Sequence, residues 1–305
     1  TTAWPSVAYT HSMFNPNQTV IRAFVSHATS AFQHAFADVS PAHIRTLETA
    51  TQTAMETLLR CDCPYHDIQH TIIVTDVGQN ILQGRQLAKG DLSADDWLHA
   101  VVAMLFHDIG YLRELLAEDT PASSVIGLDG SRVQPPMGAT DAFMAPYHVD
   151  RGALYIRERF AHEELIDVDI VAECIEMTRF PVPAEPTHNA TETLPGLVRA
   201  ADLVGQMADP QYLQKLSRLF AEFVEIGEAK RLNFKHAGDL RKNFPEFFYN
   251  QVHPYIGAGI DYLKRTQDGQ QWIANLYHHL HVNSPDQKAH PRFRAPELVV
   301  DNVTS

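Results

Sequence analysis

The sequence predicts an all-α fold that forms one bundle of helices. Apolar side chains recur at intervals of three and four residues along most of the chain, which places them on one face of a helix. No stretch of any length alternates apolar and polar residues as a half-buried strand would. Several of the apolar runs follow a Ser or Asp residue, the types that cap helix N-termini. With 305 residues and 45% hydrophobic content, the chain can bury a large core, and we expect a single domain over residues 1–305.

Composition limits the classes of partner. The formal net charge is −13, and no run of Lys or Arg forms a basic stripe, so nucleic-acid polymers are not expected partners. A small phosphorylated molecule stays open as a substrate, because a metal and a few arginines can supply positive charge locally. No stretch approaches the roughly 18 apolar residues of a membrane span. The three cysteines suit reduced thiols in the cytoplasm, and a homo-oligomer is left open.

Two helices are predicted before the first motif. The first runs from about residue 18 to 39, with an apolar stripe of Ile21, Phe24, Val25, Ala28, Phe32 and Phe36. Ser40 and Pro41 then supply an N-cap and a first-turn proline for a second helix through Arg60. We expect these helices, at residues 18–60, to pack on a core that covers about residues 60–215.

A third helix is predicted at residues 64–88, and it carries two histidines. His66 and His70 are four residues apart, so on a helix they share one face. The inward side of this helix is expected to hold Ile72, Ile73, Val77, Ile81 and Leu82.

The next helix is the most apolar of the chain and ends in a His-Asp pair. Its buried face is formed by Leu98, Val101, Val102 and Leu105, and Ser93 caps its start. Gly110 is expected to end it in the left-handed conformation that glycine adopts readily. A buried helix that brings the imidazole of His107 and the carboxylate of Asp108 to one place is costly unless something binds there. The alternative is that His107 caps its own helix and Asp108 caps the following segment.

A long segment, roughly residues 113–147, separates this helix from the next one. It is rich in Gly, Pro, Ser and Met and shows little periodicity. Long connections inside a compact domain are often functional, so a lid or rim over the site is one interpretation. A plain disordered insertion is the other.

Further helices follow to the end of the chain. One begins near Tyr147 and contains His148, and another covers residues 167–178. Asp202 is a lone carboxylate in an apolar helical run that continues to Asp209. Asp209 and Pro210 open a helix through about Ala229, with Leu213, Leu216, Phe220 and Phe223 as its core face. C-terminal helices are expected near residues 239–252, 254–265 and 268–281, followed by an extended or disordered tail at 282–305.

These motifs, taken in order, resemble a known family. His70, then His107-Asp108 on an apolar helix, then Asp202 in an Ala-Ala-Asp-Leu run, is similar to the HD superfamily of metal-dependent phosphohydrolases. Residues 64–70 resemble the YHNxxH opening of the cyclic-nucleotide phosphodiesterases, with Asp67 where those enzymes carry Asn. The resemblance covers about residues 60–215. It implies an HD-type helical bundle, a metal bound by His70, His107, Asp108 and Asp202, and His66 as proton donor.

A second metal is a further expectation from the same resemblance. His148 resembles the histidine that binds the second ion in two-metal HD proteins such as the HD-GYP family. Those proteins carry another histidine near the end of the following helix, where residues 176–179 have none. His188, in a nearby loop, is an alternative ligand and is also typical of an exposed loop residue. We therefore expect any second ion to bind more weakly than the first.

The implied ligands indicate the chemistry. Two imidazoles and two carboxylates form a mixed N/O set that suits Mn, Fe, Zn, Ni or Mg and leaves positions for water. A bound cation lowers the pKa of water and polarises a phosphoryl oxygen, so a metal-bound hydroxide can attack a nucleotide or other small phosphoester. His66 and Asp108 are the expected catalytic residues, because His66 can protonate the leaving oxygen.

Three arginines flank the motifs and are candidate phosphate contacts, namely Arg113, Arg151 and Arg179. Two other functions compete with phosphoester hydrolysis. One is a di-iron oxygenase on the same fold, which needs two irons and a fuller ligand set. The other is a regulatory module that binds the metal without turnover.

Overall fold

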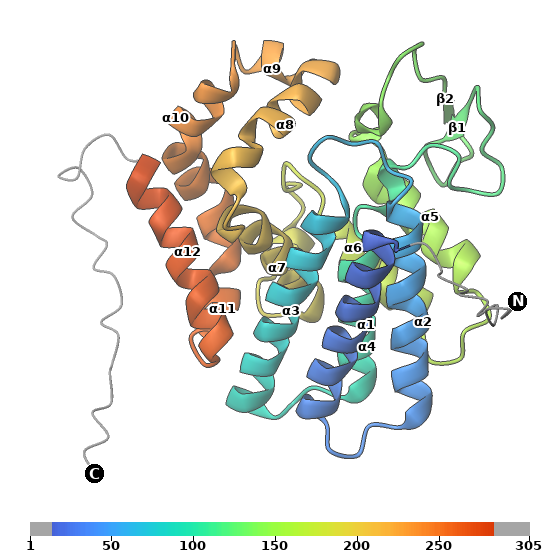
Figure 1. The fold of residues 1–305 in the computed structure, drawn as a ribbon, viewed down its shortest axis with the longest axis vertical. Helices are drawn as coiled ribbons and strands as arrows, with labels where there is room; N and C mark the ends of the chain where they lie inside the picture. Colours follow the sequence, from blue (N-terminus) through green and yellow to red (C-terminus); the bar gives the residue numbers. More distant parts are fainter. Residues whose placement is uncertain (1–13, 284–305) are drawn as a thin grey trace, which may run out of the picture.

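The computed structural model describes residues 14–283, and almost all of their regular structure is helical (Figure 1). The α-helices are α1 (Pro16–Ala35), α2 (Pro41–Leu58), α3 (Ile68–Lys89), α4 (Ala94–Phe106), α5 (His148–Arg159), α6 (Val168–Glu176), α7 (Leu194–Ala208), α8 (Tyr212–Glu225), α9 (Glu228–Arg231), α10 (Ala237–Phe247), α11 (His253–Leu263) and α12 (Gln267–Asn283). Three 3-10 turns, η1 (Ile109–Tyr111), η2 (Asp141–Met144) and η3 (Pro186–Asn189), and a π-helical turn, η4 (Phe248–Val252), join them. The predicted all-α fold is confirmed.

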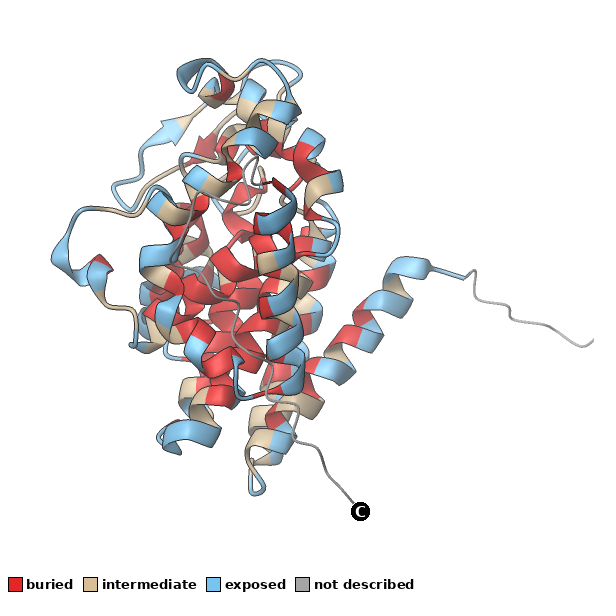
Figure 2. Ribbon diagram, turned by 90° about the vertical axis from the view of Figure 1, so that its left-hand side faces the viewer, coloured by how far each residue is buried: buried red, intermediate tan, exposed pale blue. Residues whose placement is uncertain are grey.

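The bundle is arranged around α3 and α7, which pack against each other along their length. α4 and α11 also pack against both helices, while α1 and α2 form a pair on the α3 and α4 side (Figure 1). One apolar cluster runs from Ile21 in α1 to Leu280 in α12. Figure 2 shows the buried residues gathered on the inward faces of these helices. None of the helices in residues 14–283 is long and apolar enough to cross a membrane.

The N-terminal helices begin at caps that the sequence supplies. Asn15 caps α1 by accepting the backbone N–H groups of Asn17 and Gln18, so this helix starts slightly before the predicted position. Ser40 caps α2 as predicted, with Pro41 in the first turn. At the other end of the described chain, α12 continues to Asn283, and the predicted tail beyond it lies outside the described residues.

The start of α3 differs from the prediction in a way that affects the site. Asp67 is the N-cap residue, because its carboxylate accepts the backbone N–H groups of Gln69 and His70. The helix therefore begins at Ile68, and His66 lies in the segment before it. The prediction that His66 and His70 share one helix face is wrong, since a capping Asp has extended backbone geometry.

Gly110 also differs from its expected role. It lies in η1 and is absent from the residues of the described chain with positive φ. A Cβ atom at this position would stand 1.9 Å from the His148 backbone oxygen. Gly110 is thus required for close approach of η1 to the start of α5, rather than for a left-handed helix end.

The segment 113–147 is folded. It contains a short antiparallel hairpin of β1 (Ser124–Val125) and β2 (Arg132–Val133), which is the one sheet of the described residues, and the turn η2. The Asp119 carboxylate accepts backbone N–H groups from Leu115, Leu116 and Val125. η2 packs against η1 and α8, so this segment lies beside the end of α4.

The predicted helix over 210–229 is divided. α8 ends at Glu225, Gly227 adopts a positive φ of 79°, and α9 follows. The buried face of α8 is Tyr212, Lys215, Leu216, Leu219 and Glu222. Of the predicted core residues only Leu216 is buried, and Leu213, Phe220 and Phe223 are half-buried. This helix therefore turns two charged side chains inward.

Candidate metal centre

His107 reaches the centre of the bundle because it is the C-cap residue of α4. The ring is 1% exposed, and Nδ1 lies 2.8 Å from the Met104 carbonyl oxygen. A carbonyl only accepts hydrogen bonds, so Nδ1 carries the proton and Nε2 of the neutral ring presents a lone pair to the interior. The helix end thus fixes the tautomer and the orientation of His107.

His70 and Asp202, on the two central helices α3 and α7, lie close to His107 Nε2. His70 lies in the first turn of α3, where the Asp67 cap holds its backbone N–H. Its Nε2 is 3.4 Å from Asp202 Oδ1, which lies 3.5 Å from His107 Nε2. Ligand atoms of these three residues all lie within 4.8 Å of one another, a grouping that could hold a metal ion. The structure therefore brings together three of the four predicted ligands in one tight group.

Asp108 adds a second carboxylate. Its Oδ2 is 3.2 Å from His107 Nε2 and 3.5 Å from His70 Nε2. Asp108 Oδ2 and His107 Nε2 are fully buried, yet neither has a hydrogen-bond partner within the described residues. Each unsatisfied buried polar atom costs about 1–3 kcal/mol. A cation that accepts both lone pairs would remove this cost, and the N/O donor set fits a divalent transition metal.

His148, at the start of α5, lies on the other side of Asp108. Its Nε2 is 3.9 Å from Asp108 Oδ1, and its Nδ1 is 2.6 Å from the Ala145 carbonyl oxygen. Burial lowers the pKa of His148, which favours the neutral ring that a metal requires. His188 is held elsewhere, with Nε2 3.6 Å from Glu176 Oε1.

His66 is placed by a carboxylate that the sequence reasoning missed. His66 Nδ1 lies 2.6 Å from Glu222 Oε2, and Glu222 Oε1 accepts the backbone N–H groups of Tyr65 and His66. The His66 ring stacks on Tyr111 at 4.6 Å and lies 5.5 Å from the His70 ring. Burial alone would lower the pKa of His66, but the charge and hydrogen bond of Glu222 raise it to about 9. His66 is thus an oriented side chain beside the centre, and Glu222 favours its protonated form.

Glu222 was missed because the apolar stripe predicted for its helix assigned it to the polar face. The spacing of Glu222, three residues after Leu219 and seven after Lys215, places all three side chains on one helix face, and this is the face that is buried. Charged residues are rarely buried without a partner, and each of the two on this face has one: Glu222 pairs with His66, and Lys215 pairs with Asp209.

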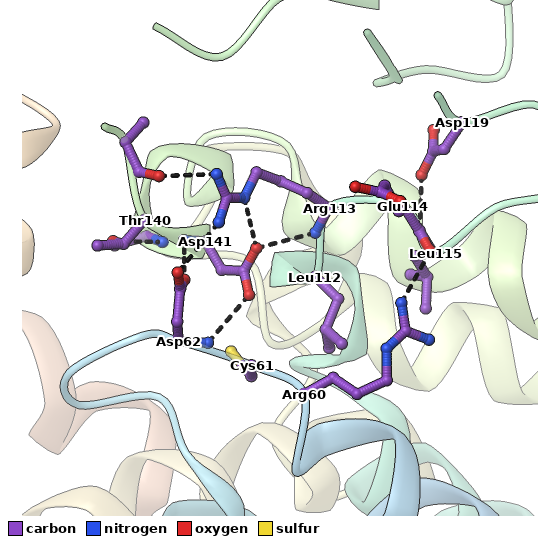
Figure 3. A network of polar contacts seen from close by, with 12 residues as sticks. Arg60, Cys61, Asp62, Leu112, Arg113, Glu114, Leu115, Asp119, Thr140 and Asp141 are labelled. Carbon is purple, nitrogen blue, oxygen red and sulfur yellow. Dashed lines mark hydrogen bonds and ion pairs between the residues drawn. The ribbon is translucent and has the colours of Figure 1, made fainter. Parts of the chain in front are cut away.

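The three predicted phosphate contacts are all engaged within the protein. Arg113 donates to Asp141 and to Asp62, and Figure 3 shows how this network joins the segment before α3 to η2. Arg179 donates to Glu176 and Asp150.

Arg151 is fully buried. It donates to the backbone oxygens of Gly110, Leu112 and Val125 and forms an ion pair with Asp119. These contacts use the guanidinium N–H donors to hold segment 113–147 against α5. The geometry therefore gives Arg151 a structural role in place of the predicted substrate contact.

Comparison with known proteins identifies a family. The family model described as Npun_R2479-like matches residues 14–285. No curated protein and no solved structure matches the chain.

Proposed function

We propose that this chain, which belongs to the Npun_R2479-like family, is a metal-dependent phosphohydrolase or phosphodiesterase acting on a nucleotide or another small phosphoester. The observation that carries the proposal is the convergence of His70, His107, Asp108 and Asp202, with two buried atoms left without partners. The resemblance of the same residues to HD-type phosphohydrolases supports it. Mn, Fe, Zn, Ni and Mg all suit this donor set.

The residues around the centre have two roles in this proposal, metal binding and proton donation. A cation held by these four ligands would activate water and polarise the phosphoryl group. Hydrolysis also needs a proton for the leaving oxygen, and His66 is the donor. Glu222 occupies His66 Nδ1, so Nε2 is the nitrogen that gives the proton. Glu222 also favours the protonated ring through its charge.

A second, more weakly bound ion fits beside Asp108. His148 Nε2 faces Asp108 Oδ1, and the Nδ1 hydrogen bond to Ala145 leaves Nε2 free to coordinate. Within the described part of the chain only His70, His107 and Asp202 form a tight ligand group. The second position therefore has fewer protein ligands than the first.

The setting we propose is that of a cytoplasmic enzyme with a small phosphorylated substrate. All three cysteines are free thiols, which suits a reducing compartment.

The test combines metal analysis with a phosphoester panel. Wild-type protein, Asp202→Asn and the control Asp261→Asn, which alters an exposed carboxylate on α11, are loaded with each metal. The panel holds nucleotides and alkyl and nitrophenyl mono- and diesters. We expect one tightly bound ion per chain in the wild type and the control, turnover with at least one metal, and loss of both in Asp202→Asn.

Other results would favour the competing functions. A wild-type protein with two irons and oxygen consumption would favour the oxygenase. A metal-loaded protein that cleaves no ester of the panel would favour the regulatory module, and one that holds no metal would remove the proposal.

A further inference from the structure

Binding a negatively charged phosphoester requires a cationic group whose charge is not already neutralised by carboxylates of the protein. The two carboxylates of the centre, Asp108 and Asp202, would balance a divalent cation. Arg113, Arg151 and Arg179 are each hydrogen-bonded to acidic side chains. None of these three guanidinium groups is therefore free to meet an anion without breaking an existing ion pair.

Arg218 is different. It lies on α8, one helical turn before Glu222, and its side chain is 53% exposed. Its nearest acidic group is Asp67, with Nη1 3.7 Å from Asp67 Oδ2. That separation is too long for a hydrogen bond, and none is made by the Arg218 side chain within residues 14–283. The guanidinium thus keeps its donors available.

The position of Arg218 is tied to the centre through Asp67. Asp67 follows His66 directly, and its other carboxylate oxygen, Oδ1, accepts the backbone N–H of His70 at 3.1 Å. Glu222, on the same helix as Arg218, holds the His66 ring. One helix, α8, therefore carries both the carboxylate that orients the proposed proton donor and an arginine whose ion pair with Asp67 is too long for a hydrogen bond.

We propose that Arg218 is the anion contact of this site and binds the phosphate group of the substrate. The inference rests on the proposed function and adds a residue that sets its substrate preference. A guanidinium presents a planar fork that matches two phosphate oxygens. The side chain exchanges its long ion pair with Asp67 for hydrogen bonds to the phosphate. An exposed ion pair of this length contributes little, so the exchange costs little.

The test measures phosphate binding separately from turnover. Inorganic phosphate is titrated calorimetrically into metal-loaded wild type, Arg218→Ala, Arg218→Lys and the control Arg265→Ala. Arg265 is exposed in the turn between α11 and α12. The neighbouring Thr266 contacts Asn80, which lies in α3 ten residues after His70. We expect the phosphate Kd to rise about tenfold in Arg218→Ala, less in Arg218→Lys, and not in the control.

Two further measurements exclude a merely structural effect. The KM for a phosphoester should rise by a similar factor in Arg218→Ala with kcat within about twofold, as expected when a uniform binding contact is lost. Phosphate should also protect Arg218 from phenylglyoxal, read by peptide mass. Metal content and thermal melting of the variants should match the wild type.

The outcomes separate the two proposals. If wild type binds phosphate and cleaves esters while Arg218→Ala does both equally well, the Arg218 inference is wrong and the proposed function stands. If wild type neither binds phosphate nor cleaves any ester, the proposed function fails, and the inference fails with it.

Discussion

At the scale of single residues, one hydrogen bond determines what the opposite side of a histidine ring can do. His107 and His148 each direct Nδ1 to the carbonyl oxygen three residues earlier, in Met104 and Ala145. Both rings therefore present Nε2 to the space around Asp108. Since the backbone sets these orientations before a ligand arrives, binding does not need to order the rings.

The first prediction concerns His66 as proton donor. General acid catalysis typically contributes about 10²- to 10⁴-fold, and its benefit shrinks when the leaving group is already acidic. His66→Ala should therefore slow hydrolysis of an alkyl phosphoester by about this factor and that of a nitrophenyl phosphoester much less. Steady-state rates on the two esters, with metal content measured in parallel, check this.

The control for this measurement is His162→Ala, which removes an exposed histidine between α5 and α6. Equal slowing of both esters would remove His66 from the acid role. Loss of metal in His66→Ala would instead make it a ligand.

The second prediction concerns the partner of His66. The Glu222 carboxylate raises the pKa of His66, so Glu222→Gln should lower this pKa while keeping the shape of the side chain. His66 acts when protonated, and activity is lost as pH rises through its pKa. The alkaline limb of the rate profile should therefore move to lower pH in Glu222→Gln, with the rate at low pH less affected. An unmoved alkaline limb would show that another group controls it.

At the scale of the element, the helices were predictable, and the errors lie where side chains act at helix ends. Apolar periodicity located α1, although its end was predicted too late, and the capping residues Ser40 and Ser93 located the starts of α2 and α4, because these are local signals. The start of α3 was misplaced because an Asp residue is compatible both with the first turn of a helix and with the N-cap position. The hydrogen bonds from the backbone N–H groups of Gln69 and His70 to Asp67 show that it is the N-cap. Glu222 was missed because its partner is distant in the sequence. The four ligands proposed for the first metal, in contrast, were predicted from the order of the motifs along the sequence.

The third prediction concerns the junction of η1 and α5. A Cβ on Gly110 would lie 1.9 Å from a backbone oxygen of His148, so Gly110→Ala must shift one of these segments. We expect a loss of about 1–3 kcal/mol in the free energy of unfolding, measured by urea denaturation. Gly257→Ala is the matched control, because its Cβ would meet no atom within 4 Å in α11.

That control should be neutral or stabilising by up to about 1 kcal/mol, since alanine has the higher helix propensity. Similar stability of Gly110→Ala and wild type would mean that η1 and α5 tolerate separation. Reduced metal content in Gly110→Ala would further show that this contact positions Asp108.

At the scale of the whole molecule, the candidate centre joins elements that are far apart in the sequence. His70 comes from α3, His107 from the end of α4 and Asp202 from α7, and these helices share one apolar core. The unfolded chain does not hold the three side chains within reach of one ion. Metal binding should therefore act on the stability of the entire bundle rather than on one segment.

The last prediction follows from this coupling. A ligand that binds only the folded state stabilises it by about 2.7 kcal/mol at a free concentration 100-fold above its Kd. This corresponds to a rise of several degrees in Tm. Calorimetric melting of the metal-free wild type with and without added metal should show that rise, and chelator should reverse it. Asp202→Asn removes a charged ligand but keeps its shape, so metal should shift its Tm little, whereas Asp261→Asn should respond as the wild type does. An equal shift in wild type and Asp202→Asn would place the stabilising ion elsewhere on the protein, and the assignment of this centre would then be wrong.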